Sequence, residues 1–156
     1  MKKLDFETLT KCVTWSKQDY YVREMTQAIL RGSDYLMIPD DDYAEAMLCL
    51  EERRIQEERL LGTMRRNNEG IELEDNGMED EAMALYEQNL KVGYPSSHSY
   101  ERLMIIYRRR KEYEKEVRVI KRAIEVYSAA GIESSVGKYS KRLAKATELL
   151  NKQNRG

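Results

Sequence analysis

The residues that most often carry chemistry are scarce in this chain. It contains one histidine, His98, and two cysteines, Cys12 and Cys49. His98 stands in a serine-rich segment next to an expected helix start, where we expect a solvated side chain rather than a catalyst or metal ligand. The cysteines lie in separate apolar segments and form no closely spaced pair, so we interpret them as reduced core residues, with a disulfide or metal pair as the alternative.

Motifs of catalysis and cofactor binding are also missing from the sequence. It has no glycine-rich phosphate loop, no Cys-x-x-Cys pair, no nucleophile elbow and no His-x-x-x-His spacing. Carboxylates are plentiful, but nothing in the sequence indicates one that is desolvated enough to shift its pKa. The sequence therefore predicts a protein that is not an enzyme and that uses no cofactor and no metal.

Two charged clusters have simpler interpretations than a ligand site. Asp40, Asp41 and Asp42 stand directly before a helical segment, where carboxylates complement the helix dipole, and no further oxygen ligand follows at a spacing that would close a cation loop. The run 108–111, Arg-Arg-Arg-Lys, falls at a helix C-terminus, where cations are favoured. The alternative for this run is an acidic peptide or phosphate bound through guanidinium groups.

Length and composition indicate a single compact domain. The chain has 156 residues, and 27 basic residues nearly balance 28 acidic ones, which argues against a general affinity for nucleic acid. No apolar run approaches the roughly 20 residues of a spanning helix, so no membrane association is expected. The first residues show no apolar stretch typical of a secretory signal, and we expect a cytoplasmic location.

The residues that could bind a partner must be positioned by helices. The sequence has two prolines and eight glycines, is rich in helix-forming residues, and shows no stretch that alternates like a half-buried strand. It predicts an all-α fold. Within residues 1–62 we expect a helical hairpin, an apolar connection at 35–39, and the start of a long helix from Tyr43 to about Asp75, either single or bent near Gly62. This N-terminal segment fits no family pattern.

The second half of the chain repeats with a period of 34 residues. Under that shift Ile71 falls on Ile105, Tyr86 on Ile120 and Leu90 on Ile124, so the apolar class is kept although few residues are identical. Helices are expected from Glu79, around 98–110, from 113 to Gly131, and from about Glu133. These segments form two hairpin units, about 63–96 and 97–130, followed by a final helix at about 133–153.

The repeating segment resembles the tetratricopeptide repeat (TPR) family. In the first unit Gly70, Gly77, Ala82 and Tyr86 match the small, turn, small and aromatic positions of that family. The family-like positions of the second unit hold Tyr100, Leu103, Tyr107, Tyr113, Ala123 and Ile124, but Met104 and Glu116 stand where small residues are usual. The resemblance implies antiparallel helical hairpins stacked as a short right-handed superhelix, closed by a C-terminal capping helix.

In the TPR family, ligands usually lie on the concave surface formed by the first helix of each hairpin. Carried over position by position, the resemblance nominates nine partner-binding residues: Asn67, Ile71, Glu74, Glu101, Arg102, Ile105, Arg108, Tyr139 and Arg142. The lysine and asparagine clamp that some members use for a peptide carboxylate is absent from the matching places. We therefore expect a non-catalytic adaptor that binds a protein or peptide; a nucleic-acid-associated regulator and a self-assembling structural protein, which would be a homo-oligomer, are the alternatives.

Overall fold

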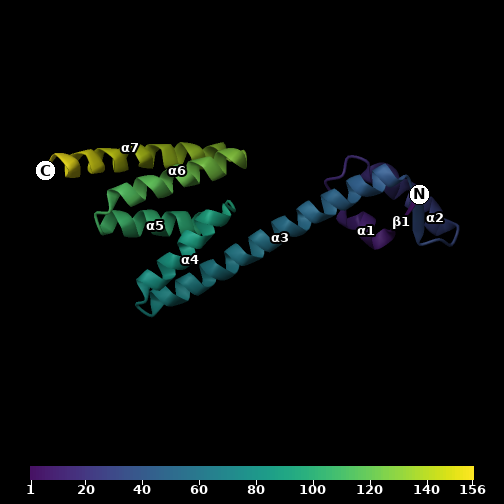
Figure 1. Ribbon diagram of the computed structural model, residues 1–156, viewed down its shortest axis with the longest axis horizontal. Coiled ribbons are helices and arrows are strands. Elements are labelled where there is room, and N and C mark those ends of the chain that lie inside the picture. Colours follow the sequence, from purple (N-terminus) through teal and green to yellow (C-terminus); the bar gives the residue numbers. More distant parts are fainter. The chain divides into compact units, whose positions relative to one another are not determined.

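The computed structural model describes residues 1–156 and is mostly helical, which confirms the predicted class (Figure 1). It contains, in chain order, β1 (Lys2–Asp5), α1 (Phe6–Lys11), α2 (Gln18–Leu30), β2 (Tyr35–Ile38), α3 (Asp40–Asp75), α4 (Glu79–Val92), α5 (Ser97–Arg109), α6 (Tyr113–Ala129) and α7 (Glu133–Arg155). Two compact units divide the chain, Met1–Glu58 and Arg59–Gly156, and each is described by itself. The single-domain organisation expected from the sequence stays a prediction.

The first unit contains two strands, where the sequence had indicated none. β1 and β2 pair antiparallel, with Leu4 opposite Leu36 and Lys2 opposite Ile38. Leu4 and Ile38 are buried, so one face of this ribbon belongs to the core. The prediction was wrong here because each strand has only four residues, too few for an alternating pattern to stand out in the sequence.

An aromatic and sulfur-containing core holds the first unit together. Trp15 stacks on Tyr21 with ring centroids 5.1 Å apart, and the Trp15 Nε1 donates to Glu45 at 3.1 Å. Cys12 is buried and Cys49 is half-buried against the same cluster, and both are free thiols, as predicted. In the first turn of α3, Asp42 accepts hydrogen bonds from Lys17 and Tyr21, so the aspartate triplet begins the helix and also ties it to α2.

α3 is a single helix of 36 residues, which settles the choice between one helix and two in favour of one. It continues without interruption through Gly62. Arg54 pairs with Glu51 and Glu58, one turn before and one turn after it, which supports the highly charged part of the helix. No helix in the chain combines the length and the apolar character needed to cross a bilayer.

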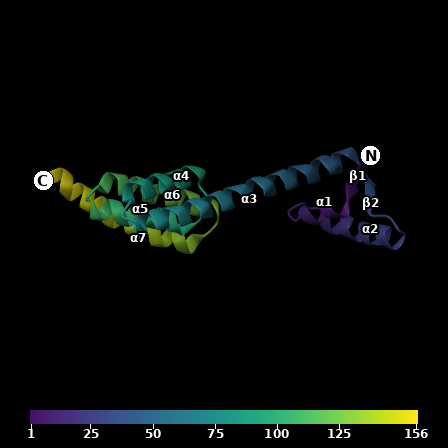
Figure 2. The ribbon, with the colours of Figure 1, turned by 90° about the horizontal axis from the view of Figure 1, so that it is seen from below.

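In the second unit the helices α4 to α7 run as successive antiparallel neighbours (Figures 1 and 2). Contacts also join alternate helices. The Glu74 carboxylate of α3 accepts from Arg102 of α5 at 2.6 Å, and Arg122 of α6 donates to the Leu90 carbonyl of α4 at 2.9 Å. α3 therefore contacts α5, and α4 contacts α6.

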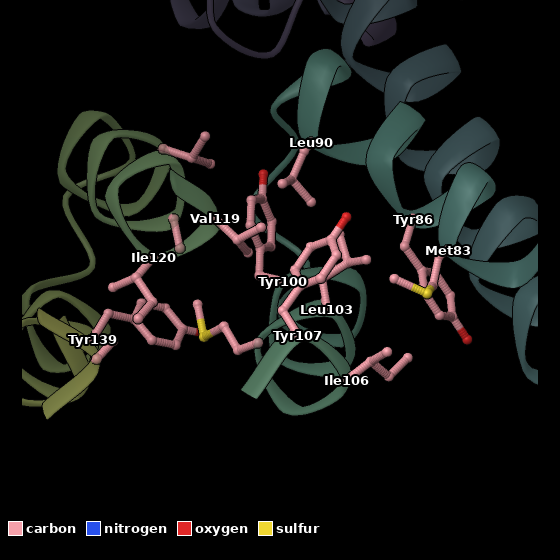
Figure 3. Packing of buried hydrophobic residues seen from close by; sticks show 14 of the residues in the cluster. Met83, Tyr86, Leu90, Tyr100, Leu103, Ile106, Tyr107, Val119, Ile120 and Tyr139 are labelled. Carbon is pink, nitrogen blue, oxygen red and sulfur yellow. The ribbon is translucent and has the colours of Figure 1, made fainter. Parts of the chain in front are cut away.

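One apolar cluster runs through the second unit from α4 to α7. Tyr86 of α4, Leu103 of α5, Ile120 of α6 and Tyr139 of α7 are all buried in it, and Figure 3 shows their side chains filling the space between the helices. Successive tyrosines pack edge to face, with Tyr127 and Tyr139 ring centroids 5.4 Å apart. Some apolar residues that recur with the 34-residue period, such as Tyr86 with Ile120, lie in this core, whereas Ile71 and Ile105 remain exposed.

The same backbone turn ends α3, α5 and α6. Gly77, Lys111 and Gly131 all have φ between 59° and 75°, and the following residue donates its N–H to the carbonyl five residues back. This is the Schellman arrangement, which favours glycine. Gly77 and Lys111 stand 34 residues apart, so the turn repeats with the helices although the glycine does not.

Candidate partner-binding site

The nine nominated residues lie on three helices of the second unit, α3, α5 and α7. Two sets of residues, here called ladders, recur on these helices with the 34-residue period. One consists of Ile71, Ile105 and Tyr139, and the other of Glu74, Arg108 and Arg142. In the first ladder the isoleucines are 40% and 44% exposed, whereas the tyrosine is 2% exposed. Equivalent positions on α3, α5 and α7 thus hold apolar side chains that differ in exposure.

A hollow of about 400 Å³ lies between α5 and α7. Four of the nominated residues line it: Glu101 and Ile105 from α5, and Tyr139 and Arg142 from α7. Met104 and Lys138 complete the lining. The structure therefore brings together, in one concavity, residues that the sequence places about 40 positions apart. Apolar walls with a few charged groups at the edge are typical of sites that bind an organic ligand or a protruding side chain.

Two charged groups at the edge of the hollow neutralise each other. Lys138 of α7 forms an ion pair with Glu101 of α5, and its Nζ also lies 5.7 Å from the centroid of the Tyr139 ring. The pair links the two helices across the opening. Neither charge needs a further partner.

A buried ion pair lies beside the hollow. Glu116 of α6 is fully buried, and Arg108 contacts both of its oxygens, with Nε to Oε2 at 3.0 Å and Nη2 to Oε1 at 2.6 Å. Only the first contact has hydrogen-bond alignment. Arg142 approaches the same carboxylate, but its Nε remains 3.7 Å from Oε1. Glu116 thus has two cations beside it and bonds well to one.

Arg142 is the least satisfied charged group at this site. Its Nε is buried and has no hydrogen-bond partner in the chain. Burial, and next the neighbouring positive charge of Arg108, lower the pKa of the Arg142 guanidinium, although Glu116 opposes this shift. The side chain as a whole is 28% exposed, so the guanidinium is a partly desolvated cation that lines the hollow.

Glu74 and Arg102 form a second polar group, where α3, α4 and α5 meet. The Tyr86 hydroxyl donates to Glu74 at 2.6 Å, and the His98 Nε2 lies 3.2 Å from that hydroxyl. Burial tends to raise the pKa of the Glu74 carboxyl, but the hydrogen bonds from Arg102 and Tyr86 outweigh it and leave the pKa below its ordinary value. His98 lies in the first turn of α5 and is half-buried, so the prediction of a solvated loop side chain was wrong.

Asn67 belongs to the interior and does not line the hollow. It is buried and accepts hydrogen bonds from Asn89 at 3.0 Å and from the Ser99 hydroxyl, and its amide donates to Ser96 at 3.2 Å. This network joins α3, α4 and α5. Asn67 thus fixes how three helices meet, which differs from the contact role that the sequence analysis nominated.

Two lining residues, Met104 and Lys138, were missed by the sequence analysis. They stand 34 residues apart and continue the ladder that begins at Gly70, so the period could have identified them. Glu116, the partner of Arg108, could not be identified from the 34-residue period. Glu116 occupies a position where the resemblance leads one to expect a small residue.

No family model, no curated protein and no solved structure matches the chain. No group of three or more histidine, cysteine, aspartate or glutamate side chains has the arrangement of a metal site.

Proposed function

We propose that this chain is a non-catalytic helical-repeat adaptor that binds a protein or peptide segment on the surface formed by α3, α5 and α7. The proposal includes a TPR-like superhelical stacking of the hairpins, with α7 as the cap. The observation that carries it is the ladder of Ile71, Ile105 and Tyr139, which recurs every 34 residues and ends in the hollow between α5 and α7.

The exposure of this ladder supports a contact role. Ile105 is 44% exposed although it lies between two core residues, Met104 and Ile106, each fully buried. A half-exposed isoleucine above a hollow can bury its remaining surface against a partner, and fully burying such a side chain contributes about 1.5–3 kcal/mol. Ile71 and Ile105 are therefore the two side chains of the ladder with apolar surface left for a partner, since Tyr139 is already buried.

The surrounding ion pairs support a fixed surface. Glu74 with Arg102 joins α3 to α5, and Glu101 with Lys138 joins α5 to α7. Each pair links two of the helices that would contact the partner. A surface held in this way loses little conformational entropy on binding, which favours recognition by a preformed shape.

The test compares two substitutions of equal chemistry in affinity capture from the native cell extract. Ile105→Lys places a charge on the proposed surface, and Leu61→Lys places one on α3 at a side chain that is 63% exposed and does not line the hollow. We expect a specific protein to be captured by the wild type and by Leu61→Lys, and its recovery by Ile105→Lys to fall at least about tenfold.

Other outcomes would favour the alternative functions. Recovery of nucleic acid with a steep salt dependence would support a nucleic-acid-associated regulator, and recovery of the chain itself would support self-assembly. Equal capture by both lysine variants would place the binding surface elsewhere. Arg102 and Arg108 are unsuitable for this test because their charges hold Glu74 and the buried Glu116.

A further inference from the structure

We propose that the hollow between α5 and α7 selects an acidic peptide segment, which inserts an apolar side chain against Ile105 and Tyr139 and places a neighbouring carboxylate on Arg142. This inference rests on the proposed function and deepens it by naming the chemistry of the partner. It follows from the charges that remain unsatisfied around the hollow.

The charges that line the hollow do not balance. Lys138 and Arg142 are positive and Glu101 is negative, which leaves one positive charge in excess. Lys138 and Glu101 neutralise each other across the opening, so the excess lies on Arg142. The deeper pair of Arg108 and Glu116 is neutral as a pair and does not change this balance.

Arg142 is also the cation that gains most from an anion. No hydrogen bond within the chain uses its guanidinium, and its distance of 3.7 Å from Glu116 exceeds hydrogen-bond length. A peptide carboxylate could accept two parallel N–H bonds from such a group, the arrangement in which arginine binds carboxylates best. It would also shield Arg142 from the charge of Arg108.

The other residues that line the hollow indicate which peptide side chain would bind beside the carboxylate. Met104, Ile105 and Tyr139 are apolar over most of their surface, and a hollow of about 400 Å³ accommodates a leucine-sized side chain with room to spare. Glu101 repels a carboxylate from its own side of the opening. The acidic residue is therefore expected toward Arg142, one helical turn beyond Lys138 on α7.

The experiment begins with a random peptide library displayed against the immobilised full chain. Enriched peptides are then synthesised in pairs, one with its acidic residue and one with the matching amide, and their affinities are measured by fluorescence anisotropy. The protein variants are Arg142→Gln and a control, Lys141→Gln, which removes the same charge from the next residue, an exposed one that does not line the hollow. Circular dichroism verifies that both remain folded.

We expect enriched peptides that combine an aliphatic or aromatic residue with Asp or Glu. The acidic peptide should lose about tenfold or more in affinity on Arg142→Gln and keep its affinity on Lys141→Gln, which is the size expected for a hydrogen bond between charged groups. The amide peptide should bind the wild type and Arg142→Gln equally. The comparison of the acidic peptide with the amide peptide on the wild type leaves the protein unchanged, so it does not depend on how well the variant folds.

Three results would overturn the inference in distinguishable ways. Enriched peptides without acidic residues, or acidic peptides insensitive to Arg142→Gln, would remove the acidic selectivity while the adaptor function stands. Equal losses on Arg142→Gln and Lys141→Gln would reduce the effect to general electrostatic attraction. A library from which no peptide is enriched would count against the adaptor function itself.

Discussion

The two hairpins of the second unit, α3 with α4 and α5 with α6, follow one period with different chemistry. In the first hairpin Gly70 faces the ring of Tyr86, and Ala82 fills a fully buried position. In the second, the equivalent residues are Met104 and Glu116, both also fully buried. The first hairpin achieves close packing with small residues. The second accommodates larger ones, one of which is charged.

The two hairpins also differ in the ion pair formed three residues after Ile71 and Ile105. Glu74 of the first hairpin pairs forward with Arg102 of the next one, at 2.6 Å. Arg108, its equivalent in the second hairpin, pairs with Glu116 of its own second helix, also at 2.6 Å. One pair joins hairpins and the other closes a hairpin internally. A helical repeat can therefore conserve its geometry while the sign and direction of its ion pairs reverse.

Of the substitutions that test this difference between the hairpins, removal of the Arg108 side chain should change the stability most. Arg108→Ala leaves the fully buried Glu116 without its aligned donor, and breaking such a pair costs about 3–5 kcal/mol. We expect a loss of about 3 kcal/mol in the free energy of unfolding of the second unit, near the lower end because Arg142 stays within 3.7 Å of Glu116. Urea unfolding followed by circular dichroism measures it.

The matched control gives the second hairpin the chemistry of the first. The double variant Arg108→Leu, Glu116→Ala removes both charges and places at 116 the residue that stands at 82. Replacing a buried pair by apolar residues of similar volume is often neutral, but alanine is smaller than the fully buried glutamate, so we expect a loss of about 1–2 kcal/mol, less than for Arg108→Ala. A loss below about 1 kcal/mol for Arg108→Ala alone, the value of an exposed pair, would mean that water reaches Glu116.

Gly70→Ala tests the packing of the first hairpin. A Cβ at this position would lie 2.4 Å from Cε1 and 2.7 Å from Cζ of Tyr86, a buried ring whose hydroxyl is held by Glu74. We expect a loss of about 1–3 kcal/mol, although alanine favours helix more than glycine does. Thermal unfolding compares it with Gly137→Ala on α7, where a Cβ would meet nothing within 4 Å. The stability of that control should rise by up to about 1 kcal/mol. An equal rise for Gly70→Ala would mean that the Tyr86 ring moves aside at little cost.

Substitutions in the Schellman turn that ends the first helix of each hairpin should have a smaller effect on stability, with opposite signs in the two hairpins. Lys111 holds a left-handed conformation, φ 59°, at the position where the first hairpin has Gly77, φ 75°. Lys111→Gly removes this steric cost, so we expect a gain of up to about 1 kcal/mol, or about 2–4 °C in Tm. Gly77→Ala should lose about 1 kcal/mol, since nothing within 4 Å adds a clash and only the backbone is strained. If both substitutions changed the free energy of unfolding in the same direction, the φ angle would be excluded as the cause.

The helices of the second unit could be predicted because local signals set their ends. Gly131 stops α6 and Glu79 begins α4 as expected, and a glycine, Gly93, also caps the end of α4. The strands could not be predicted, since β1 and β2 acquire their pattern only when Leu4 and Leu36, over 30 residues apart, come together. Local periodicity determines helices, whereas pairing across sequence distance determines this ribbon.

The nominated contact residues show the same limit. Glu101, Ile105, Tyr139 and Arg142 do share one hollow, because they follow the helical period. Asn67 satisfies the same period but is buried, since Asn89 and Ser99 from other helices supply its hydrogen bonds. A period tells which face of a helix a residue occupies. Whether a polar side chain there meets solvent depends on partners that lie outside the pattern.

The smallest effect expected is a pH dependence that arises at the junction of the two hairpins. Burial, and to a lesser degree Arg102, lower the pKa of the His98 imidazole below its ordinary 6.5, although Glu74 opposes the shift. The unfolded chain then binds the proton more tightly than the folded one. The stability that comes from neutral His98 is thus fully present above about pH 6.5 and is lost as the pH falls through the lower, folded pKa.

His98→Gln should remove this component and leave the rest of the acid sensitivity, which comes from carboxylates such as Glu74, unchanged. Because His98 is the only histidine, its Cε1 proton can be followed by NMR without assignment, and we expect a midpoint below 6.5 in the folded protein. Urea midpoints measured at about pH 7.5 and about pH 5.5 should then differ more in the wild type than in His98→Gln. A midpoint above 6.5 would mean that the attraction of Glu74 exceeds the cost of burial, and the junction would then gain stability on acidification through that range.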